Sequence, residues 1–222
     1  MQNKFIKLFA EPKKDRPVLD LTLTVGELAA DTVMKGDVLE AVPFVGLAFK
    51  ALKAKDTVSD ALYARKLVGF VNGIGDLAPK EREKAAAQLL KQDAQVAGET
   101  ILLVLDRITD LDKPELLGLL FKHFALGRMT SEQLRRLAVA VDSAFGDDLR
   151  DFLWKPPEST EEDVQDCLRR LAPSGLTFLN FEPGTIRMPK YHFTELGTFL
   201  FGLVLGEHLN DPVPSGRRPA KL

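Results

Sequence analysis

The stretch from Leu168 to Leu205 is the part of the chain in which the hydrophobic pattern changes its period. A helical pattern gives way at Leu176 to a run rich in Phe, Leu and Thr, and this run stops at the turn residues Glu182, Pro183 and Gly184. A second short run, Pro189–Phe193, leads to an apolar helical segment that Thr194 is predicted to cap. Short apolar runs on either side of turn residues are typical of a β-hairpin. The stretch therefore predicts a helix, a hairpin and a second helix.

The chain before this stretch predicts helices only. Between residues 57 and 145 the apolar residues recur at helical spacing, and the signals for helix starts and ends lie between them. The starts are predicted at Thr57, Pro79, Asp112, Thr130 and Thr160, and Gly127 is predicted to end one helix. Gln133 and Asp163 stand at the capping-box positions after Thr130 and Thr160. The inward face of the helix that follows Thr130 is predicted from Leu134, Leu137, Ala138, Val141 and Phe145. Because the loops are short, successive helices should run antiparallel and form a bundle.

The expected fold class is mainly α, with a helical bundle followed by a small α+β module that contains the hairpin. The expected division is a flexible basic arm over 1–18, the bundle over 19–153, the module over 158–209, and a disordered tail over 210–222. The module can also recruit 130–153. Adjacent prolines at 156 and 157 are the strongest linker signal in the chain.

Composition excludes several classes of protein. The formal net charge is −2, so the chain as a whole has no attraction for nucleic acid or anionic lipid. Cys167 is the single cysteine, which rules out an intrachain disulfide. No secretory signal is recognisable, and no apolar run approaches the roughly 18 residues of a membrane-spanning helix. We therefore expect a cytoplasmic protein.

The sequence offers no set of residues that predicts catalysis. The three histidines, at 123, 192 and 208, do not have metal-ligand spacing with one another or with Cys167. Motifs for phosphate binding, zinc proteases and serine hydrolases are missing from the sequence. Pairs of acidic residues such as Asp106 and Asp110 are typical of helix ends. We therefore expect a protein that is not an enzyme and that uses no cofactor or metal.

The end of the chain carries a family resemblance. The segments "LRRLAPSGLTFL" and "YHFTELGTFLFGLVL", joined by the expected hairpin, resemble the second half of a winged-helix domain. Bacterial winged-helix regulators often begin the helix after the wing with Thr-Glu-Leu-Gly, which stands here at Thr194–Gly197. The resemblance implies a winged-helix-like fold for about the last third of the chain, and a DNA-binding role for the helix before the hairpin.

That helix departs from the family's usual chemistry. It opens with Glu161, Glu162 and Asp163, followed by Asp166, and these carboxylates would repel phosphates. The residues left to bind DNA are Arg169, Arg170, Arg187 and Lys190. The acidic opening favours a hairpin that contacts protein. Its predicted partner-binding residues are Phe181, Ile186, Arg187, Met188 and Tyr191.

A fainter resemblance covers the whole chain. An apolar segment with Pro43 and Gly46, followed by "SDALYARKLVGFV" and a helical bundle, resembles poorly characterised bacterial abortive-infection proteins, which act in phage defence. The resemblance implies a role in defence or stress through protein contacts or the membrane. The apolar segment is predicted as a buried core helix. In the alternative it lies on a membrane surface, through Phe44, Phe49, Lys50 and Lys53.

Three functional hypotheses follow from the sequence. The first is a non-enzymatic protein-interaction or adaptor component of a bacterial defence or stress system, whose partner is another protein encoded nearby. The second is a winged-helix DNA-binding transcriptional regulator. The third is a membrane-active effector that uses the amphipathic helix 42–55. The sequence predicts no oligomeric state.

Overall fold

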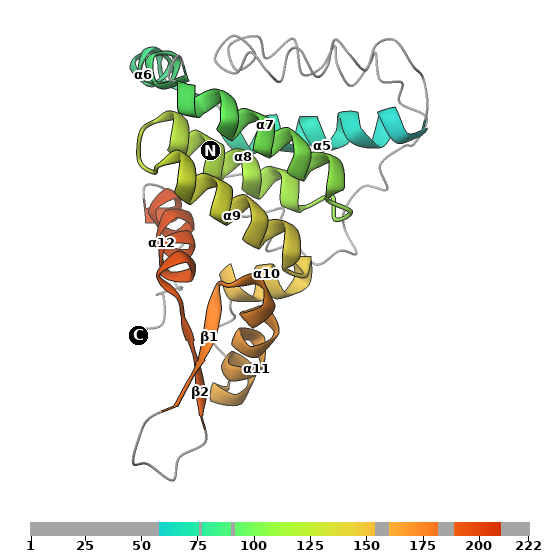
Figure 1. Cartoon of the computed structure of the whole chain (residues 1–222), viewed down its shortest axis with the longest axis vertical. Helices are drawn as coiled ribbons and strands as arrows, with labels where there is room; N and C mark the ends of the chain where they lie inside the picture. The colour runs from blue at the N-terminus through green and yellow to red at the C-terminus, as the bar shows by residue number, and fades with distance from the viewer. Residues whose placement is uncertain (1–57, 76, 90–91, 154–159, 182–188, 210–222) are drawn as a thin grey trace. The chain divides into compact units, whose positions relative to one another are not determined.

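A computed structural model describes residues 58–75, 77–89, 92–153, 160–181 and 189–209. Over these residues the fold is mainly α with one small β-hairpin, as the sequence predicts (Figure 1). The elements are α5 (Val58–Ile74), α6 (Pro79–Leu89), α7 (Gln92–Arg107), α8 (Lys113–Ala125), α9 (Ser131–Ser143), α10 (Gly146–Leu153), α11 (Glu161–Leu171), the 3-10 helix η2 (Ala172–Ser174), β1 (Thr177–Asn180), β2 (Lys190–Phe193) and α12 (Glu195–Leu209). The described residues fall into two compact units, 58–138 and 139–209.

The first unit is built around the crossing of α5 and α8. At Gly73 an added Cβ would lie 1.9 Å from the carbonyl oxygen of Glu115, and at Gly118 it would lie 1.9 Å from that of Phe70. The two backbones therefore touch, which glycine alone permits. Beside the crossing, the rings of Phe70 and Phe121 pack with centroids 5.6 Å apart. Helices α6 and α7 also contact this unit's core.

Helix α8 begins and ends where the sequence predicts, but only its C-terminal end is formed by the predicted interaction. Gly127 follows the helix with a φ of +69°, the left-handed conformation that commonly ends helices. Asp112 stands at the N-cap position, but the prediction that it caps the helix is wrong in mechanism. Its backbone is already helical and its side chain makes no capping hydrogen bond. The chain enters α8 through a turn in which the Asp112 amide donates to Oδ1 of Asp110.

Helix α9 starts with the predicted capping box. The Thr130 amide donates to Oε1 of Gln133, and the Gln133 amide donates to Oγ1 of Thr130. The predicted inward residues Leu134, Leu137, Ala138 and Val141 are buried. Phe145 is the exception, because it is 67% exposed. The helix ends at Ser143, so Phe145 leaves the helical register that would have turned it inward.

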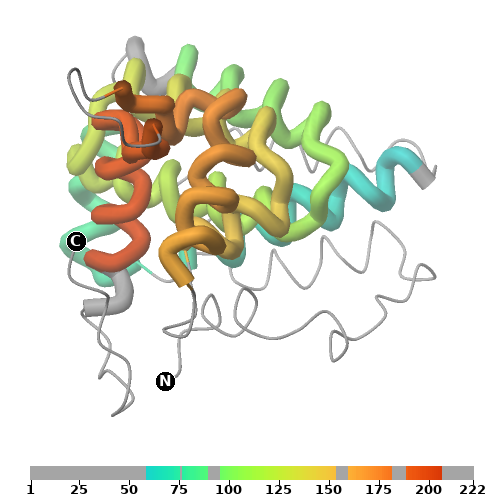
Figure 2. The backbone as a smooth tube through the Cα atoms, turned by 90° about the horizontal axis from the view of Figure 1, so that it is seen from below, coloured from blue at the N-terminus to red at the C-terminus, as the bar shows by residue number. Residues whose placement is uncertain are grey.

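We call α10, α11, η2, β1, β2 and α12 the hairpin module. Thr160 and Asp163 form a complete capping box at the start of α11. The strands are antiparallel, with Thr177 opposite Phe193 and Asn180 opposite Lys190. The Gly197 amide donates to Oγ1 of Thr194, which confirms the predicted cap of α12. In Figures 1 and 2 the hairpin lies beside α11, and in Figure 1 β2 leads directly into α12.

The core of the hairpin module joins its elements through apolar and aromatic contacts. Phe152 of α10 packs edge-on against Phe193 of β2, with centroids 5.0 Å apart, and Phe201 of α12 lies 5.7 Å from Phe193. Cys167 is buried on the inner face of α11. At Gly197 an added Cβ would lie 2.0 Å from the carbonyl oxygen of Leu176, so α12 begins in contact with the backbone before β1.

Several predicted features lie outside the described residues. They are the basic arm 1–18, the Thr57 cap, the linker prolines, the tail 210–222, and the segment with the candidate membrane residues Phe44, Phe49, Lys50 and Lys53. Within the described residues, no helix is both long enough and apolar enough to cross a membrane.

Candidate partner-binding hairpin

The hydrogen-bond pattern of the hairpin determines which backbone groups face outward. The Thr194 amide donates to the Leu176 carbonyl at 3.0 Å, so this opposed pair is a hydrogen-bonded pair. Hydrogen-bonded and non-hydrogen-bonded pairs alternate along an antiparallel ladder. Leu179 and Tyr191, which face each other three residues further along, are therefore a non-hydrogen-bonded pair. The amide and carbonyl of Leu179 therefore point toward the outer edge of β1, and those of Tyr191 point toward the outer edge of β2.

A side chain of α11 closes the outer edge of β2. The Tyr191 amide donates to Oε1 of Gln165 at 2.7 Å, and Nε2 of Gln165 donates to the Tyr191 carbonyl at 3.3 Å. The glutamine amide thus occupies both groups that another strand would use. Pro189 and Lys190 at the start of β2 further discourage pairing at this edge.

Within the described part of the chain, the outer edge of β1 is left uncovered at Leu179. Among the described residues, no hydrogen bond reaches the Leu179 amide or carbonyl from outside the hairpin. The run from Leu176 to Phe181 carries no charged residue and no proline. Two of its aromatic side chains are exposed, Phe178 at 45% and Phe181 at 68%. An edge strand of this kind is a template for pairing with another chain.

The basic residues of the hairpin module are bound to carboxylates. Nη2 of Arg169 lies 2.6 Å from Oδ1 of Asp166. Nε of Arg170 lies 2.6 Å from Oδ1 of Asp148, and its guanidinium also pairs with Asp166. The Lys190 ammonium is paired with Glu161.

These pairs change the affinity of the side chains for protons. The hydrogen bond from Lys190 lowers the pKa of Glu161, with the positive charge of Lys190 adding to the effect. A hydrogen bond from Arg169 is the main cause that lowers the pKa of Asp166. The hydrogen bond to Asp148 raises the pKa of Arg170. Each shift favours the charged form, so these ion pairs persist near neutral pH.

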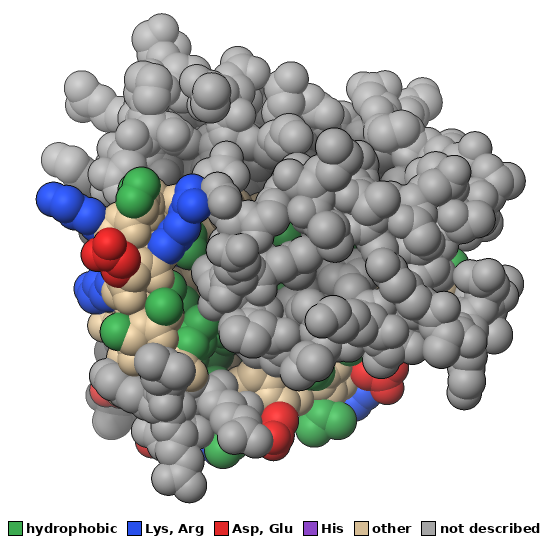
Figure 3. All heavy atoms as spheres, turned by 90° about the horizontal axis from the view of Figure 1, so that it is seen from above, with side chains coloured by type: hydrophobic (Ala, Val, Ile, Leu, Met, Phe, Trp, Pro, Cys, Tyr) green, Lys and Arg blue, Asp and Glu red, His purple; other side chains and the backbone are tan. Residues whose placement is uncertain are grey.

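The charge of this unit is negative. The sequence from 139 to 209 contains twelve Asp and Glu residues and six Arg and Lys residues, a formal charge of −6. A negative field repels nucleic acid and attracts basic segments. Figure 3 shows a different face, that of the first unit near α6, where the visible side chains of described residues mix both signs with hydrophobic groups.

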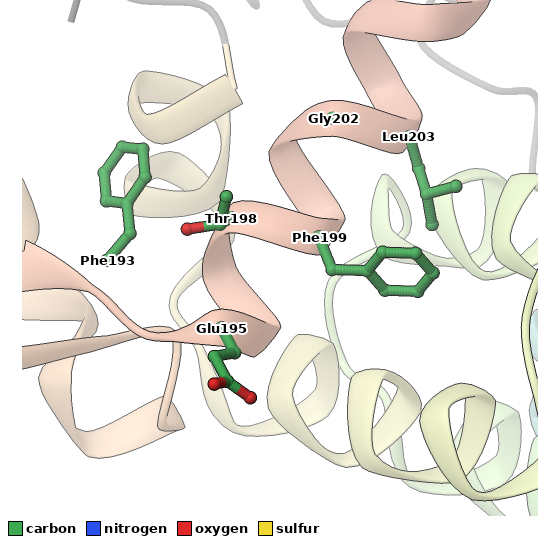
Figure 4. A pocket seen from close by; sticks show the side chains of 6 residues that line it. All are labelled: Phe193, Glu195, Thr198, Phe199, Gly202 and Leu203. Atoms are coloured by element: carbon green, nitrogen blue, oxygen red, sulfur yellow. The ribbon is translucent and has the colours of Figure 1, made fainter.

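An apolar hollow of about 560 Å³ lies along α12. It is lined by Phe193, Glu195, Thr198, Phe199, Gly202 and Leu203 (Figure 4). The single charged side chain of this lining, Glu195, stands at the start of the helix. The hollow is wide open, and its lining offers no group of convergent polar atoms that would bind a small polar ligand.

The first unit contains one group of perturbed titratable side chains. Nζ of Lys66 on α5 donates to the backbone carbonyl of Asp106 on α7 at 2.8 Å. Burial lowers the pKa of Lys66, although the negative charge of Asp106 acts in the opposite direction. Burial also raises the pKa of Tyr63, and the charge of Asp106 adds to this effect. Because the ammonium is already bound to a backbone carbonyl, the arrangement ties α5 to α7.

The predicted partner-binding residues have different environments. Phe181 is exposed at the end of β1. Tyr191 is half-buried, and its backbone is engaged by Gln165. Ile186, Arg187 and Met188 lie outside the described residues.

Sequence reasoning missed Phe178, Leu179 and Gln165. Phe178 and Leu179 could have been found, because a two-stranded sheet packed on one helix leaves one face and one edge uncovered. Gln165 has no local sequence signal, since its partner Tyr191 is 26 residues away.

Comparison with known proteins supplies no relative. No family model, curated protein or solved structure matches the chain.

No group of three or more His, Cys, Asp or Glu side chains suited to a metal occurs in the described part of the chain.

Proposed function

We propose that this chain is a non-enzymatic interaction component that binds another protein through its hairpin module. One observation carries the proposal. The described cations available for DNA are each paired with a carboxylate, whereas the hairpin exposes aromatic side chains and an unpaired strand edge. The surface that the winged-helix resemblance assigns to DNA thus has the chemistry of a protein contact.

The exposed aromatic residues supply the expected binding energy. Covering a Phe side chain removes apolar surface from water and contributes about 1.5–3 kcal/mol for each fully buried ring. Phe178 packs loosely beside His192, with ring centroids 6.1 Å apart, and keeps nearly half of its surface exposed. Phe181 has still more surface to bury. Exposed aromatic residues of this kind are enriched at protein interfaces.

DNA binding would have to overcome the local electrostatics. A phosphate that approached Arg170 would compete with Asp148, whose side chain is only 12% exposed. Removing the cation from Asp148 would leave a nearly buried carboxylate without its counter-ion, which is costly. The exposed carboxylates of Glu161 and Glu162 would add repulsion.

Affinity purification with paired substitutions tests the proposal. The full chain is tagged and recovered from the cells that produce it, together with a Phe178→Ser, Phe181→Ser variant. The control is Phe145→Ser, because Phe145 is as exposed as Phe181 but lies outside the hairpin. We expect a stoichiometric protein that is retained by the wild type and by Phe145→Ser, and lost from the double variant.

Two outcomes would contradict the proposal. One is the absence of a stoichiometric partner, or a partner whose retention is the same in all three proteins. The other is a DNA mobility shift at low salt that is abolished by Arg187→Glu with Lys190→Glu, because a phosphate-binding wing would give that result.

A further inference from the structure

We infer that the open edge of β1 binds an extended segment of the partner protein as a third strand, and that this segment is apolar with Lys or Arg residues at its ends. The inference rests on the proposed function and specifies how the partner is held. It is carried by the outward amide and carbonyl of Leu179, the exposed aromatic side chains beside them, and the negative charge of the module.

The two edges of the sheet show why β1 is the binding edge. At β2 the Gln165 side chain already takes the place of a neighbouring strand, with one donated and one accepted hydrogen bond to Tyr191. At β1 the equivalent groups of Leu179 have no such partner among the described residues. An added strand would supply there the two hydrogen bonds that Gln165 supplies at β2.

Side chains next to the edge determine the chemistry of the segment. Phe178 and Leu179 point to opposite faces of β1 and are both exposed, and Phe181 extends the apolar surface. A neighbouring strand places its side chains beside those of β1, where aromatic and β-branched pairs are favourable. The segment should therefore be rich in Val, Ile, Thr or aromatic residues.

Charge selects another protein in preference to a second copy. Two copies joined at β1 would bring together two units that each carry a formal charge of −6 over residues 139–209. A segment flanked by Lys or Arg is instead attracted by the same field. When the segment lies beside the uncharged strand β1, the Lys or Arg residues at its ends would lie in the negative field of the surrounding unit.

Selection from a displayed library of nine-residue segments on the full-length protein tests the inference. We expect the enriched peptides to combine a central apolar run with terminal Lys or Arg. One enriched peptide, synthesised with a fluorophore, is then titrated with two variants. Leu179→Pro removes the outward amide hydrogen while sparing the ladder to β2, in which this amide takes no part. Leu179→Thr is the control that keeps the amide.

The expected result is a loss of affinity of about tenfold for Leu179→Pro and little change for Leu179→Thr, since each lost strand hydrogen bond weakens the complex. A second comparison leaves the protein intact. The same peptide N-methylated at the residue opposite Leu179 should lose affinity to a similar extent, and exchange of the Leu179 amide hydrogen should slow when the unmodified peptide binds.

Other results would overturn the inference. These are the failure of any peptide to be enriched, enriched peptides that bind Leu179→Pro and the N-methylated form without loss, or enrichment of acid-flanked segments. A concentration-dependent dimer that Leu179→Pro abolishes would assign the edge to a second copy instead. A partner that is lost with the Phe178 and Phe181 substitutions but kept by Leu179→Pro would reject strand addition and leave the proposed function intact.

Discussion

The backbone of α5 and α8 is covered where the two helices cross, whereas the backbone of β1 faces outward at Leu179. At the crossing, Gly73 and Gly118 allow each helix to lie against the carbonyl groups of the other. At β1, exposed side chains flank an amide and a carbonyl that no described residue binds from outside the hairpin. The first arrangement contributes stability and has no room for a ligand, and the second leaves two backbone hydrogen-bonding groups facing outward.

The contrast shows where tolerance to substitution is expected. A closely packed backbone crossing fails when a single methyl group is added, because neither carbonyl can move without its helix. An open strand edge keeps its fold when side chains change, because its own ladder does not use the outward groups. Stability and binding should therefore respond to substitutions in different regions of the chain.

The largest effect is expected from Gly118→Ala. The added Cβ would lie 1.9 Å from the Phe70 carbonyl oxygen, so α5 and α8 must separate. We expect the free energy of unfolding to fall by about 3 kcal/mol or more, measured by chemical denaturation. Gly202→Ala in α12 is the matched control, because an added Cβ meets nothing within 4 Å there and alanine favours a helix by about 1 kcal/mol over glycine. Equal stability of Gly118→Ala and the wild type would show that the crossing is not close-packed.

A smaller effect is expected within the hairpin module from Arg170→Ala. Its guanidinium is the counter-ion of Asp148, whose side chain is nearly buried. Removing it should lower the free energy of unfolding by about 2 kcal/mol, since a buried charged acceptor is left without its donor. Arg169→Ala removes an exposed pair and should change stability by less than about 0.5 kcal/mol. Equal losses in the two variants would contradict the assignment of Arg170 to the fold.

The contrast between the two strand edges predicts a local effect from Gln165→Ala. The substitution removes both hydrogen bonds to Tyr191 and should make β2 as open as β1. We expect exchange of the Tyr191 amide hydrogen to accelerate toward that of Leu179, with a loss of about 1 kcal/mol in stability. In Gln165→Glu the carboxylate still accepts from the Tyr191 amide, so protection should largely persist. A Tyr191 amide that stays protected in Gln165→Ala would mean that another group covers this edge.

Local sequence signals predicted local structure well. The capping boxes of Thr130 with Gln133 and of Thr160 with Asp163 join residues three positions apart, and both are present. The hairpin was predictable for the same reason, because its strands and turn residues are contiguous in the sequence.

Features that depend on distant residues were not predictable from the pattern. The contact of Asp148 with Arg170 spans 22 residues, and neither residue has a sequence signal for the other. Phe145 was expected inside because the helical period was extended past Ser143, where the helix in fact stops. Which edge of the sheet is covered follows from Gln165, whose contact with Tyr191 spans 26 residues and cannot be read from the period of a strand.

The smallest effect concerns the ion pair between Lys190 on β2 and Glu161 on α11. Lys190 holds the pKa of Glu161 below the value of about 4.3 that is usual for glutamate. A carboxylate with a lowered pKa contributes stability above its unfolded-state pKa, and the contribution disappears as the pH falls through the folded-state pKa. The ion pair between Lys190 and Glu161 should therefore stabilise the contact of β2 with α11 at neutral pH, and this contribution should decrease in acid below about pH 4.3.

A carboxyl titration by NMR checks this expectation. In Lys190→Met the Glu161 carboxyl should titrate at a higher pH than in the wild type, because it loses both the hydrogen bond and the charge of Lys190. Arg169→Met is the control, since it should raise the pKa of Asp166 and leave that of Glu161 unchanged. If Glu161 titrates identically in the wild type and in Lys190→Met, then Lys190 is not bound to it in solution. Lys190 would then be available to phosphate, and the difference in chemistry between the hairpin and a DNA-binding wing would become smaller.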